Sequence, residues 1–269
     1  MKTKKVNQFD IINKFKTNGI VVLKKFLNNT DDFFKLTNKF TLKYSNDSKR
    51  RVAKHSSGKI KTVDIGNSSI PLHSESSFTT TWPVIIWFYC KKISNQSAST
   101  NYSDGIEIWK NLCTDTKKFF LSKPLVFQNK IDIEITTNAK GIKNWYMDYV
   151  GVKNCKLDYN QKKLCFDFIK FAVQKDNYTD KLCFANHILS AYEKDEPQIK
   201  KISTIDNRPI PTKIIEEIKK ISKKNTIKHS WDEGDVIMLN NHRFMHGRDK
   251  IKQNDKREIF NAQSLIVNF

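Results

Sequence analysis

Two short segments carry side chains that can bind one metal ion. In the segment Ile70–Ser76, the imidazole of His73 and the carboxylate of Glu75 stand two positions apart. On a strand, residues at this spacing project from the same face, so both can reach one ion. A second histidine, His246, lies far along the chain. Two histidines and one carboxylate on one face of an octahedral ion leave three positions open, as in non-haem iron(II) oxygenases. We therefore predict that these three residues bind iron(II).

A His-x-Glu pair is common by chance, and His73 has a structural alternative as a strand histidine that is hydrogen-bonded at the surface. Four further residues are predicted to contact the substrate: Phe78, Trp82, Asn186 and His187. For Phe78 and Trp82 the alternative is packing in the core. For Asn186 and His187 the alternative is a core or surface histidine whose hydrogen bonds are already satisfied. On a strand, His242 lies too far from His246 to share its ion, so we expect it beside the site. Arg51 and His55 are expected to reach an anionic substrate from a surface loop.

The elements that must position these residues are mostly strands. The run Val84–Cys90 is almost entirely apolar and aromatic, which is typical of a strand buried on both faces. Further strands are predicted over residues 20–23, 125–136, 164–173 and 182–189. In the C-terminal region the pattern predicts hairpins made of segments 226–231, 236–240, 244–250 and 257–267, with a turn at Glu233–Asp235.

Several helices are expected beside these strands. Phe9, Ile12 and Phe15 have helical spacing before Gly19, and Thr30 is a predicted N-cap of a helix that runs to Phe40. Asp104 can cap a helix that ends near Cys113, and Pro211 can begin a lysine-rich helix that carries isoleucines at helical spacing. The polar segment 45–70 is predicted to be a loop or lid. The whole pattern is mainly β with flanking helices, and it favours a double-stranded β-helix (jelly roll) core over a doubly wound α/β fold.

Length and cysteine usage indicate the broad class. A chain of 269 residues with 38% hydrophobic residues can form one good core, so we expect residues 1–269 to be a single domain. The five cysteines are odd in number, widely spaced and mostly in apolar runs, which indicates free thiols in a reducing compartment. The sequence shows neither a secretory signal nor a membrane span, so a cytoplasmic location is expected.

The net charge of +20 is compatible with nucleic acid or an acidic protein as a partner. The excess is mainly lysine and is spread along the chain, and the densest basic stretch, Lys200–Lys228, has the spacing of an amphipathic surface helix. Recognition of nucleic acid usually shows a clustered basic stripe with arginines for base edges and aromatic rings for stacking. The charge alone therefore favours a solvated surface.

With these segments in view, most of the chain resembles the taurine dioxygenase and clavaminate synthase-like superfamily of Fe(II)- and 2-oxoglutarate-dependent oxygenases. Leu72–Glu75 resembles the first iron motif of that family, and Trp82-Pro83 with the strand that follows resembles its next element. Trp231–Asn241 resembles the tryptophan, Gly-Asp turn and strand before the second iron histidine, and His246–Arg248 resembles the family's His-Gly-Arg.

The resemblance also implies a 2-oxoglutarate site. The family usually has a Gly-Gly-x-Thr turn whose threonine contacts the cosubstrate; here the turn is Ser97–Thr100, so the glycines are lost and Thr100 stays. Arg257 stands where the family places the arginine that binds the distal carboxylate, a task suited to a planar guanidinium. Arg248 is a second candidate for the cosubstrate, and a structural salt bridge is the alternative for both arginines. Many relatives carry another arginine four residues after the first, where this chain has Asn261.

The resemblance implies a dioxygenase that hydroxylates or desaturates an unactivated C–H bond of a small metabolite, amino-acid-like or a natural-product intermediate, with release of succinate and CO2. Halogenating relatives carry a small residue in place of Glu75, so oxidation is expected here. Two alternatives stay open. The same chemistry can act on a nucleic-acid base or on a substrate bound to an acidic carrier protein, and the loss of the glycines before Thr100 also fits a non-catalytic jelly-roll binding protein.

Overall fold

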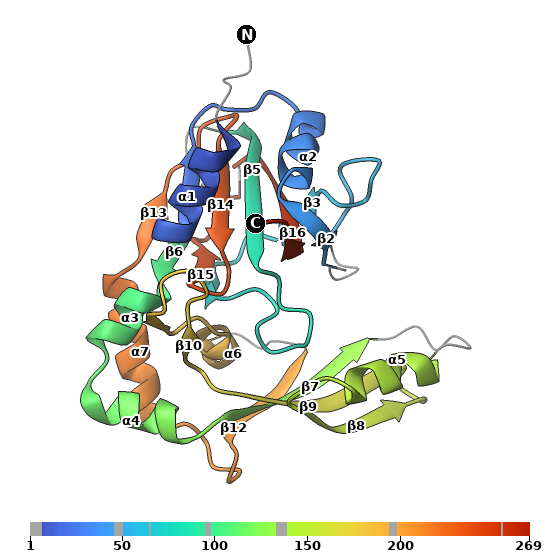
Figure 1. Ribbon diagram of the computed structural model, residues 1–269, viewed down its shortest axis with the longest axis vertical. Helices are drawn as coiled ribbons and strands as arrows, with labels where there is room; N and C mark the ends of the chain where they lie inside the picture. Colours follow the sequence, from blue (N-terminus) through green and yellow to red (C-terminus); the bar gives the residue numbers. More distant parts are fainter. Residues whose placement is uncertain are drawn as a thin grey trace.

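The computed structural model describes residues 7–45, 51–64, 66–94, 98–132, 139–193, 198–253 and 255–269. Figure 1 shows strands at the centre of the molecule, helices packed around them, and a further sheet that projects from one end. The fold is mainly β with flanking helices and has the jelly-roll core that the sequence predicts. In the described residues, no helix is both long enough and apolar enough to cross a membrane.

The first jelly-roll sheet has the order β1-β14-β5-β16-β2. Its strands are antiparallel, and the short strand β3 also pairs with β16. The bounds are β1 (Ile20–Leu23), β14 (Val236–Asn240), β5 (Ile85–Ile93), β16 (Arg257–Val267), β2 (Thr41–Tyr44) and β3 (Lys61–Thr62).

The second jelly-roll sheet has the order β13-β6-β15-β4 and carries two of the predicted metal ligands. The bounds are β13 (Ile227–His229), β6 (Thr100–Asp104), β15 (Phe244–Arg248) and β4 (Ile70–His73). In the register of β4 and β15, His73 lies directly opposite His246. Within the described chain β4 is the edge strand of this sheet, and its pairing with β15 is irregular after His246.

β5 is buried on both faces, as its sequence predicts. Ile85, Trp87 and Tyr89 pack with α1 and α2 on one side of the first sheet, whereas Ile86 and Phe88 face the second sheet. Residues i and i+2 of a strand share a face, so an unbroken apolar run is what two packed layers require.

Helices cover the outside of this core. α1 (Gln8–Asn18) ends at Gly19, whose N–H donates to the carbonyl of Phe15 and whose φ of 70° favours glycine. Asp104 caps α3 (Gly105–Asn111), as predicted. The bounds of the other helices are α2 (Thr30–Asn38), α4 (Thr114–Ser122), α5 (Ala139–Met147), α6 (Ile188–Glu193) and α7 (Thr212–Lys224). Ile214, Ile215 and Ile218 of α7 are buried, so the lysine-rich helix is amphipathic as expected.

A further sheet projects beyond the jelly roll in the lower part of Figure 1, with α5 packed against β8. Its order is β12-β7-β9-β8, with bounds β12 (Ile199–Thr204), β7 (Leu125–Asp132), β9 (Lys163–Lys170) and β8 (Val152–Asp158). A small two-stranded sheet is formed by β10 (Gln174–Lys175) and β11 (Leu182–Cys183).

Four expectations from the sequence are wrong. The C-terminal strands lie where predicted but are not hairpins, since β14 and β16 belong to the first sheet and β13 and β15 to the second. The predicted strand over residues 182–189 stops at Cys183 and is followed by α6, because the side chain of Asn186 accepts from the N–H of Ile188 and caps that helix. The N-cap of α2 is Asn29 rather than Thr30, and Pro211 is the N-cap residue of α7 rather than its first helical residue.

The segment that was expected to be a loop or lid is described at residues 51–64 and 66–70, and it contains β3 and the beginning of β4. Residues 46–50 and 65 lie outside the described chain, as do 133–136 of the strand predicted over 125–136. All five cysteines are free thiols, of which Cys90 and Cys183 are buried.

Asp235 holds the turn that leads into β14. Its buried carboxylate accepts hydrogen bonds from Lys24 Nζ at 2.7 Å and from the backbone N–H groups of Lys25 and Asp232 at 2.9 and 3.0 Å. Burial by itself raises the pKa of Asp235, but these donors outweigh it and bring the pKa below its ordinary value. The charged carboxylate therefore stabilises the folded state.

We expect Asp235→Asn to lower the free energy of unfolding by about 2 kcal/mol at pH 7, because hydrogen bonds to a charged group contribute about 1.5–3 kcal/mol. Since the folded pKa is depressed, this stabilisation is complete above the unfolded pKa of about 4 and is lost as the pH falls through the folded pKa. Urea unfolding between pH 7 and pH 3 measures the difference, with Asp180→Asn at a 90% exposed carboxylate as the control. A difference that stays constant down to pH 3 contradicts this assignment.

Candidate metal centre and cosubstrate cavity

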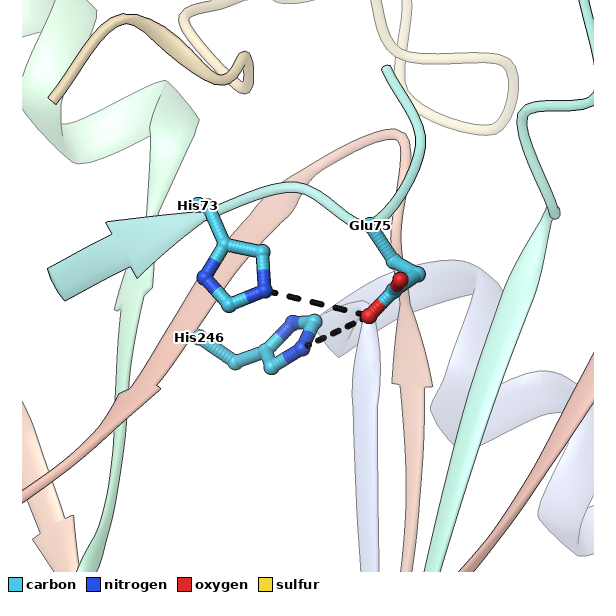
Figure 2. Close-up of side chains that lie close together, drawn as sticks. All are labelled: His73, Glu75 and His246. Carbon is cyan, nitrogen blue, oxygen red and sulfur yellow. Dashed lines mark ion pairs between the residues drawn. The ribbon is translucent and has the colours of Figure 1, made fainter. Parts of the chain in front are cut away.

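The three predicted metal ligands meet at one place (Figure 2). Glu75 Oε2 lies 3.8 Å from His73 Nε2 and 3.8 Å from His246 Nε2. Within the described residues, the three form a group whose donor atoms all lie within 4.8 Å of one another. One ion can contact all three at these separations, so the donor set of two imidazoles and one carboxylate fits a metal that leaves a face open for other ligands.

His73 and His246 are brought together by direct pairing of β4 with β15. Their ring centroids are 4.5 Å apart, and both side chains are buried. The Nδ1 atom of His73 lies 2.9 Å from the carbonyl oxygen of Pro71 and can donate to it, which turns Nε2 toward Glu75. A backbone contact of this kind sets the ring orientation before any ion binds.

Glu75 does not lie on a strand, because β4 ends at His73 and Glu75 begins a turn. The expectation that strand geometry would align His73 with Glu75 is therefore wrong in its detail. The backbone N–H of Ser74 donates instead to the carbonyl of Asn186, and the N–H of Glu75 donates to Oδ1 of Asn241 at 2.8 Å. These backbone N–H groups take no part in strand pairing, so the chain turns and points the carboxylate of Glu75 toward the two imidazoles.

Asn241 is a positioning residue that the motifs did not reveal. Its side chain is fully buried and donates from Nδ2 to the carbonyls of Glu75 and Pro83, at 3.0 and 2.9 Å. One amide thus ties the turn that carries Glu75 to the segment between β14 and β15, which leads to His246. Asn241 lies five residues before His246, and this position was the available sequence signal for a role near the site. The residues that Asn241 contacts are far from it in sequence, so the contacts themselves could not be predicted.

The charges of the three ligands follow from their burial and from one another. Burial on its own raises the pKa of Glu75, but the charge of Arg51 and the neighbouring imidazoles of His246 and His73 bring it well below its usual value. Burial and the charge of His73 lower the pKa of His246 to about 4. Burial also opposes the charged form of His73, yet the nearby carboxylate raises its pKa. An ionised carboxylate and a neutral imidazole are the forms that bind metals.

The cluster opens into a cavity with about 430 Å³ of empty space, part of it open to solvent. Thr100, Arg248 and Arg257, the predicted cosubstrate residues, line this cavity together with the three ligands. The structure therefore brings both halves of the predicted site into one space, although they come from β4, β6, β15, β16 and the turn after β4.

The two arginines differ in what they already bind. Arg248 donates to three backbone carbonyls, those of Asp64, Gly66 and Ser68, at 2.7–3.0 Å, so it fastens a loop. Arg257 donates to one described acceptor, the carbonyl of Ala98 at 2.7 Å, and its buried Nε has no acceptor among the residues that the structure describes. Burial and the charge of Arg248 lower the pKa of Arg257 to about 10, which leaves it charged at neutral pH. Arg257 thus offers its unused donors to an anion.

Thr100 lies at the start of β6, and its hydroxyl oxygen accepts from the indole N–H of Trp231 at 2.9 Å. That contact leaves the Thr100 hydroxyl hydrogen available for another acceptor in the cavity. Ala98 and Ser99 of the predicted turn are described, whereas Ser97 is outside the described chain.

The predicted substrate residues lie near the metal cluster but not in this cavity. Phe78 and His187 pack beside each other with ring centroids 4.6 Å apart, and the His187 ring is 5.1 Å from that of His73. Asn186 donates to the carbonyl of Ala172 and accepts from the N–H of Ile188, so both ends of its amide bind backbone. A direct role for Asn186 toward substrate would require those bonds to break.

Trp82 is held in a stack near the same turn. Its indole N–H donates to Ser74 Oγ at 2.7 Å, His242 lies against its ring at 4.1 Å, and the ammonium of Lys170 lies 3.5 Å from the ring centroid. Burial lowers the pKa of Lys170 to about 7. His242, which was expected beside the site or at the surface, is half-buried against Trp82 and is not among the candidate metal ligands of the described residues.

Gly247 allows the two ligand-bearing strands to approach. A Cβ atom at this position would lie 2.4 Å from the carbonyl oxygen of Ile70 on β4, closer than real contacts allow. We expect Gly247→Ala to lower the free energy of unfolding by about 2 kcal/mol or more, because the backbone of β4 must shift. Chemical denaturation measures this. Gly58→Ala is the comparison, since nothing lies within 4 Å there and only a left-handed backbone cost of about 1 kcal/mol is expected. Equal losses would rule out the close approach as the cause.

Comparisons with known proteins agree with this geometry. The family model described as taurine catabolism dioxygenase TauD, TfdA family, matches residues 7–263. A search of curated proteins found no significant match. A taurine dioxygenase from Burkholderia xenovorans has a similar structure, with a TM-score of 0.63 at 11% identity over 99% of this chain and 83% of that one.

Two further solved structures share the fold. AAD-2, solved with Mn(II) and N-oxalylglycine, has a TM-score of 0.61 at 14% identity over 99% of this chain and 90% of that one. PvcB of Pseudomonas aeruginosa has a TM-score of 0.61 at 9% identity over 98% of this chain and 81% of that one. Another structure of PvcB is described as an Fe, alpha-ketoglutarate dependent oxygenase from an isonitrile synthetic pathway.

Proposed function

The chain belongs to the taurine catabolism dioxygenase TauD, TfdA family, and on that premise we propose that it is an Fe(II)- and 2-oxoglutarate-dependent dioxygenase that oxidises a C–H bond of a small molecule. His73, Glu75 and His246 hold the iron, and Arg257 and Thr100 hold 2-oxoglutarate. When bound, iron would supply the redox chemistry by which dioxygen oxidises both 2-oxoglutarate, to succinate and CO2, and the substrate C–H bond. The substrate class we propose is a small metabolite, amino-acid-like or a natural-product intermediate, which is hydroxylated or desaturated.

One observation carries this proposal: the metal cluster lines the same cavity as Arg257, a partly buried arginine whose Nε has no acceptor among the described residues. A metal site alone fits many functions, and an arginine alone fits any anion. Together they match a ligand that chelates a metal at one end and carries a carboxylate at the other. 2-Oxoglutarate has this chemistry, as does N-oxalylglycine, which was bound with Mn(II) in AAD-2.

The protein's own groups perform three tasks in this reaction. Glu75 and the imidazole Nε2 atoms fix the ion on one face, because Asn241 and the carbonyl of Pro71 orient Glu75 and His73. Arg257 and the Thr100 hydroxyl orient the cosubstrate at its far carboxylate. Phe88, which packs 5.3 Å from the His246 ring, gives the cavity an apolar wall that limits water.

The test is anaerobic incubation of the purified protein with iron(II) and 2-oxoglutarate, then exposure to air with a panel of small metabolites. We expect succinate to form with iron and 2-oxoglutarate present, and one class of metabolite to gain oxygen or lose two hydrogens by mass spectrometry. Tight binding of both ligands without succinate formation across the panel would favour a non-catalytic binding protein.

A further inference from the structure

Arg51 enters the metal site from a segment far from the family motifs. Its side chain is only 7% exposed, and its Nη2 donates to Glu75 Oε2 at 3.0 Å. Its Nη1 donates to Asn261 Oδ1 on β16 at 3.3 Å, and its Nε donates to Asp64 at 3.0 Å. The guanidinium thus joins a metal ligand to the strand that carries Arg257.

The segment that carries Arg51, residues 51–64, is held in place along its length, and we call it the strap. β3, within the strap, pairs with Phe260 and Asn261 of β16. The His55 ring stacks on Phe34 of α2 with centroids 4.4 Å apart. At the end of the strap, the carbonyl of Asp64 accepts from Arg248. The backbone of the strap is therefore anchored to three separate elements, so Arg51 does not depend on its own contacts to reach Glu75.

The charges in the cavity show what this guanidinium can do. Three arginines, Arg51, Arg248 and Arg257, line the cavity with two carboxylates, Glu75 and Asp64. Arg248 spends its two terminal nitrogens on backbone carbonyls, and the buried Nε atoms of Arg248 and Arg257 have no acceptor among the described residues. Among the arginines that line the cavity in the described residues, Arg51 is therefore the one in contact with a metal ligand.

We propose that Arg51 is a positioning residue of the oxygenase reaction: it holds the Glu75 carboxylate and supplies positive charge for the cosubstrate carboxylate nearest the metal. The inference rests on the proposed function. The two negative charges of 2-oxoglutarate are then balanced at both ends of the cavity, by Arg257 and by Arg51. Asn261 cannot supply such a charge, but it lies within hydrogen-bond distance of the group that does.

The test separates ligand binding from turnover. Calorimetric titration first measures Mn(II) binding and then 2-oxoglutarate binding to the Mn(II)-loaded protein, for wild type, Arg51→Gln and Arg208→Gln. The control removes an arginine whose side chain is 79% exposed. We expect Arg51→Gln to bind 2-oxoglutarate at least about tenfold more weakly, because the dianion needs the charge. Mn(II) affinity should change less, because losing the contact that orients Glu75 weakens the metal site whereas losing a positive charge beside the ion favours it. The control should bind both as wild type does.

A second-site variant tests position as well as charge. Because Arg51 Nη1 contacts Asn261, an arginine at 261 can reach the same region when Arg51 is absent. We expect the double variant Arg51→Gln/Asn261→Arg to regain at least about threefold in 2-oxoglutarate affinity over Arg51→Gln. Thermal unfolding of every variant is recorded, and Arg51→Lys, expected to bind at least about threefold more weakly than wild type, replaces Arg51→Gln should that variant not fold.

The outcomes are distinct. If wild type does not bind 2-oxoglutarate in the presence of Mn(II), the proposed function itself fails. If wild type binds and Arg51→Gln binds equally well, the role of Arg51 is overturned. It is also overturned if Arg51→Gln loses Mn(II) and 2-oxoglutarate affinity together with its unfolding temperature and the arginine at 261 restores nothing, since Arg51 would then serve only the fold.

Discussion

Glu75→Ala is expected to weaken metal binding by at least about 100-fold and to reduce 2-oxoglutarate-dependent succinate formation to background. Losing a group that only orients a metal ligand already costs 10- to 100-fold, so losing a ligand should cost more. The effect should be large here because Glu75 Oε2 is the atom that faces both imidazoles, at 3.8 Å from each Nε2. Calorimetric titration with Mn(II) measures binding, and succinate is quantified in chloride-free buffer so that no halide takes the vacated position.

The matched control is Glu216→Ala on α7. The Glu216 side chain is 62% exposed and pairs only with Lys219 in the described residues, so its loss should leave metal binding and turnover unchanged. Succinate formation by Glu75→Ala at more than a tenth of the wild-type rate would contradict the assignment of this carboxylate to the metal. The unfolding midpoint of Glu75→Ala is recorded as well, because the variant leaves Arg51 with Asp64 as its remaining carboxylate partner in the described residues.

Arg257→Ala is expected to raise the KM for 2-oxoglutarate by about 30-fold or more, equivalent to about 2 kcal/mol of binding free energy. Removing one partner of a buried, hydrogen-bonded charge pair costs about 2–5 kcal/mol. The incompletely paired guanidinium of Arg257 is available to pair with the cosubstrate carboxylate, since Ala98 is its one described acceptor in the protein. The kcat at saturating cosubstrate should fall much less than kcat/KM, because the ion and its ligands are untouched.

Steady-state kinetics with varied 2-oxoglutarate measure this effect, and Arg208→Ala at the exposed surface is the control. Arg248→Ala gives a useful contrast, because Arg248 binds the carbonyls of Asp64, Gly66 and Ser68 and its loss should lower thermal stability as well. If Arg257→Ala changed stability and left the KM unchanged, Arg257 would be a structural residue, and the cosubstrate carboxylate would need another partner.

Local sequence patterns predicted the elements well and their partners poorly. β5 and β16 could be located because apolar runs and turn residues act over a few positions. The pairing of β14 with β1 and β5 could not, because strands from opposite ends of the chain choose partners through packing of whole sheets. The sequence of the turn at Glu233–Asp235 is the same whether the next strand pairs with the preceding one or joins the facing sheet. Hairpins were therefore predicted where the chain changes sheet.

The candidate site shows the same limit. His73, Glu75, Thr100, His246 and Arg257 could be predicted because each belongs to a short motif with a typical spacing, and the structure places them around one cavity. Asn241 ends a segment that resembles the family but was given no role there, and Arg51 lies outside the motifs. Both contact Glu75 through long-range hydrogen bonds, and only the folded chain brings those atoms together. Arg51 was expected to meet an anionic substrate, whereas its described partners are groups of the protein itself.

The position of β4 at the edge of its sheet has a consequence for local unfolding. An edge strand of four residues with irregular pairing should open at a lower free energy than the buried strands beside it. A metal ion bound by His73 on β4 and His246 on β15 would join the edge to the sheet interior as a reversible cross-link. Metal affinity and the opening free energy of β4 are then linked quantities, and backbone amide exchange in this strand reports on the occupancy of the metal site.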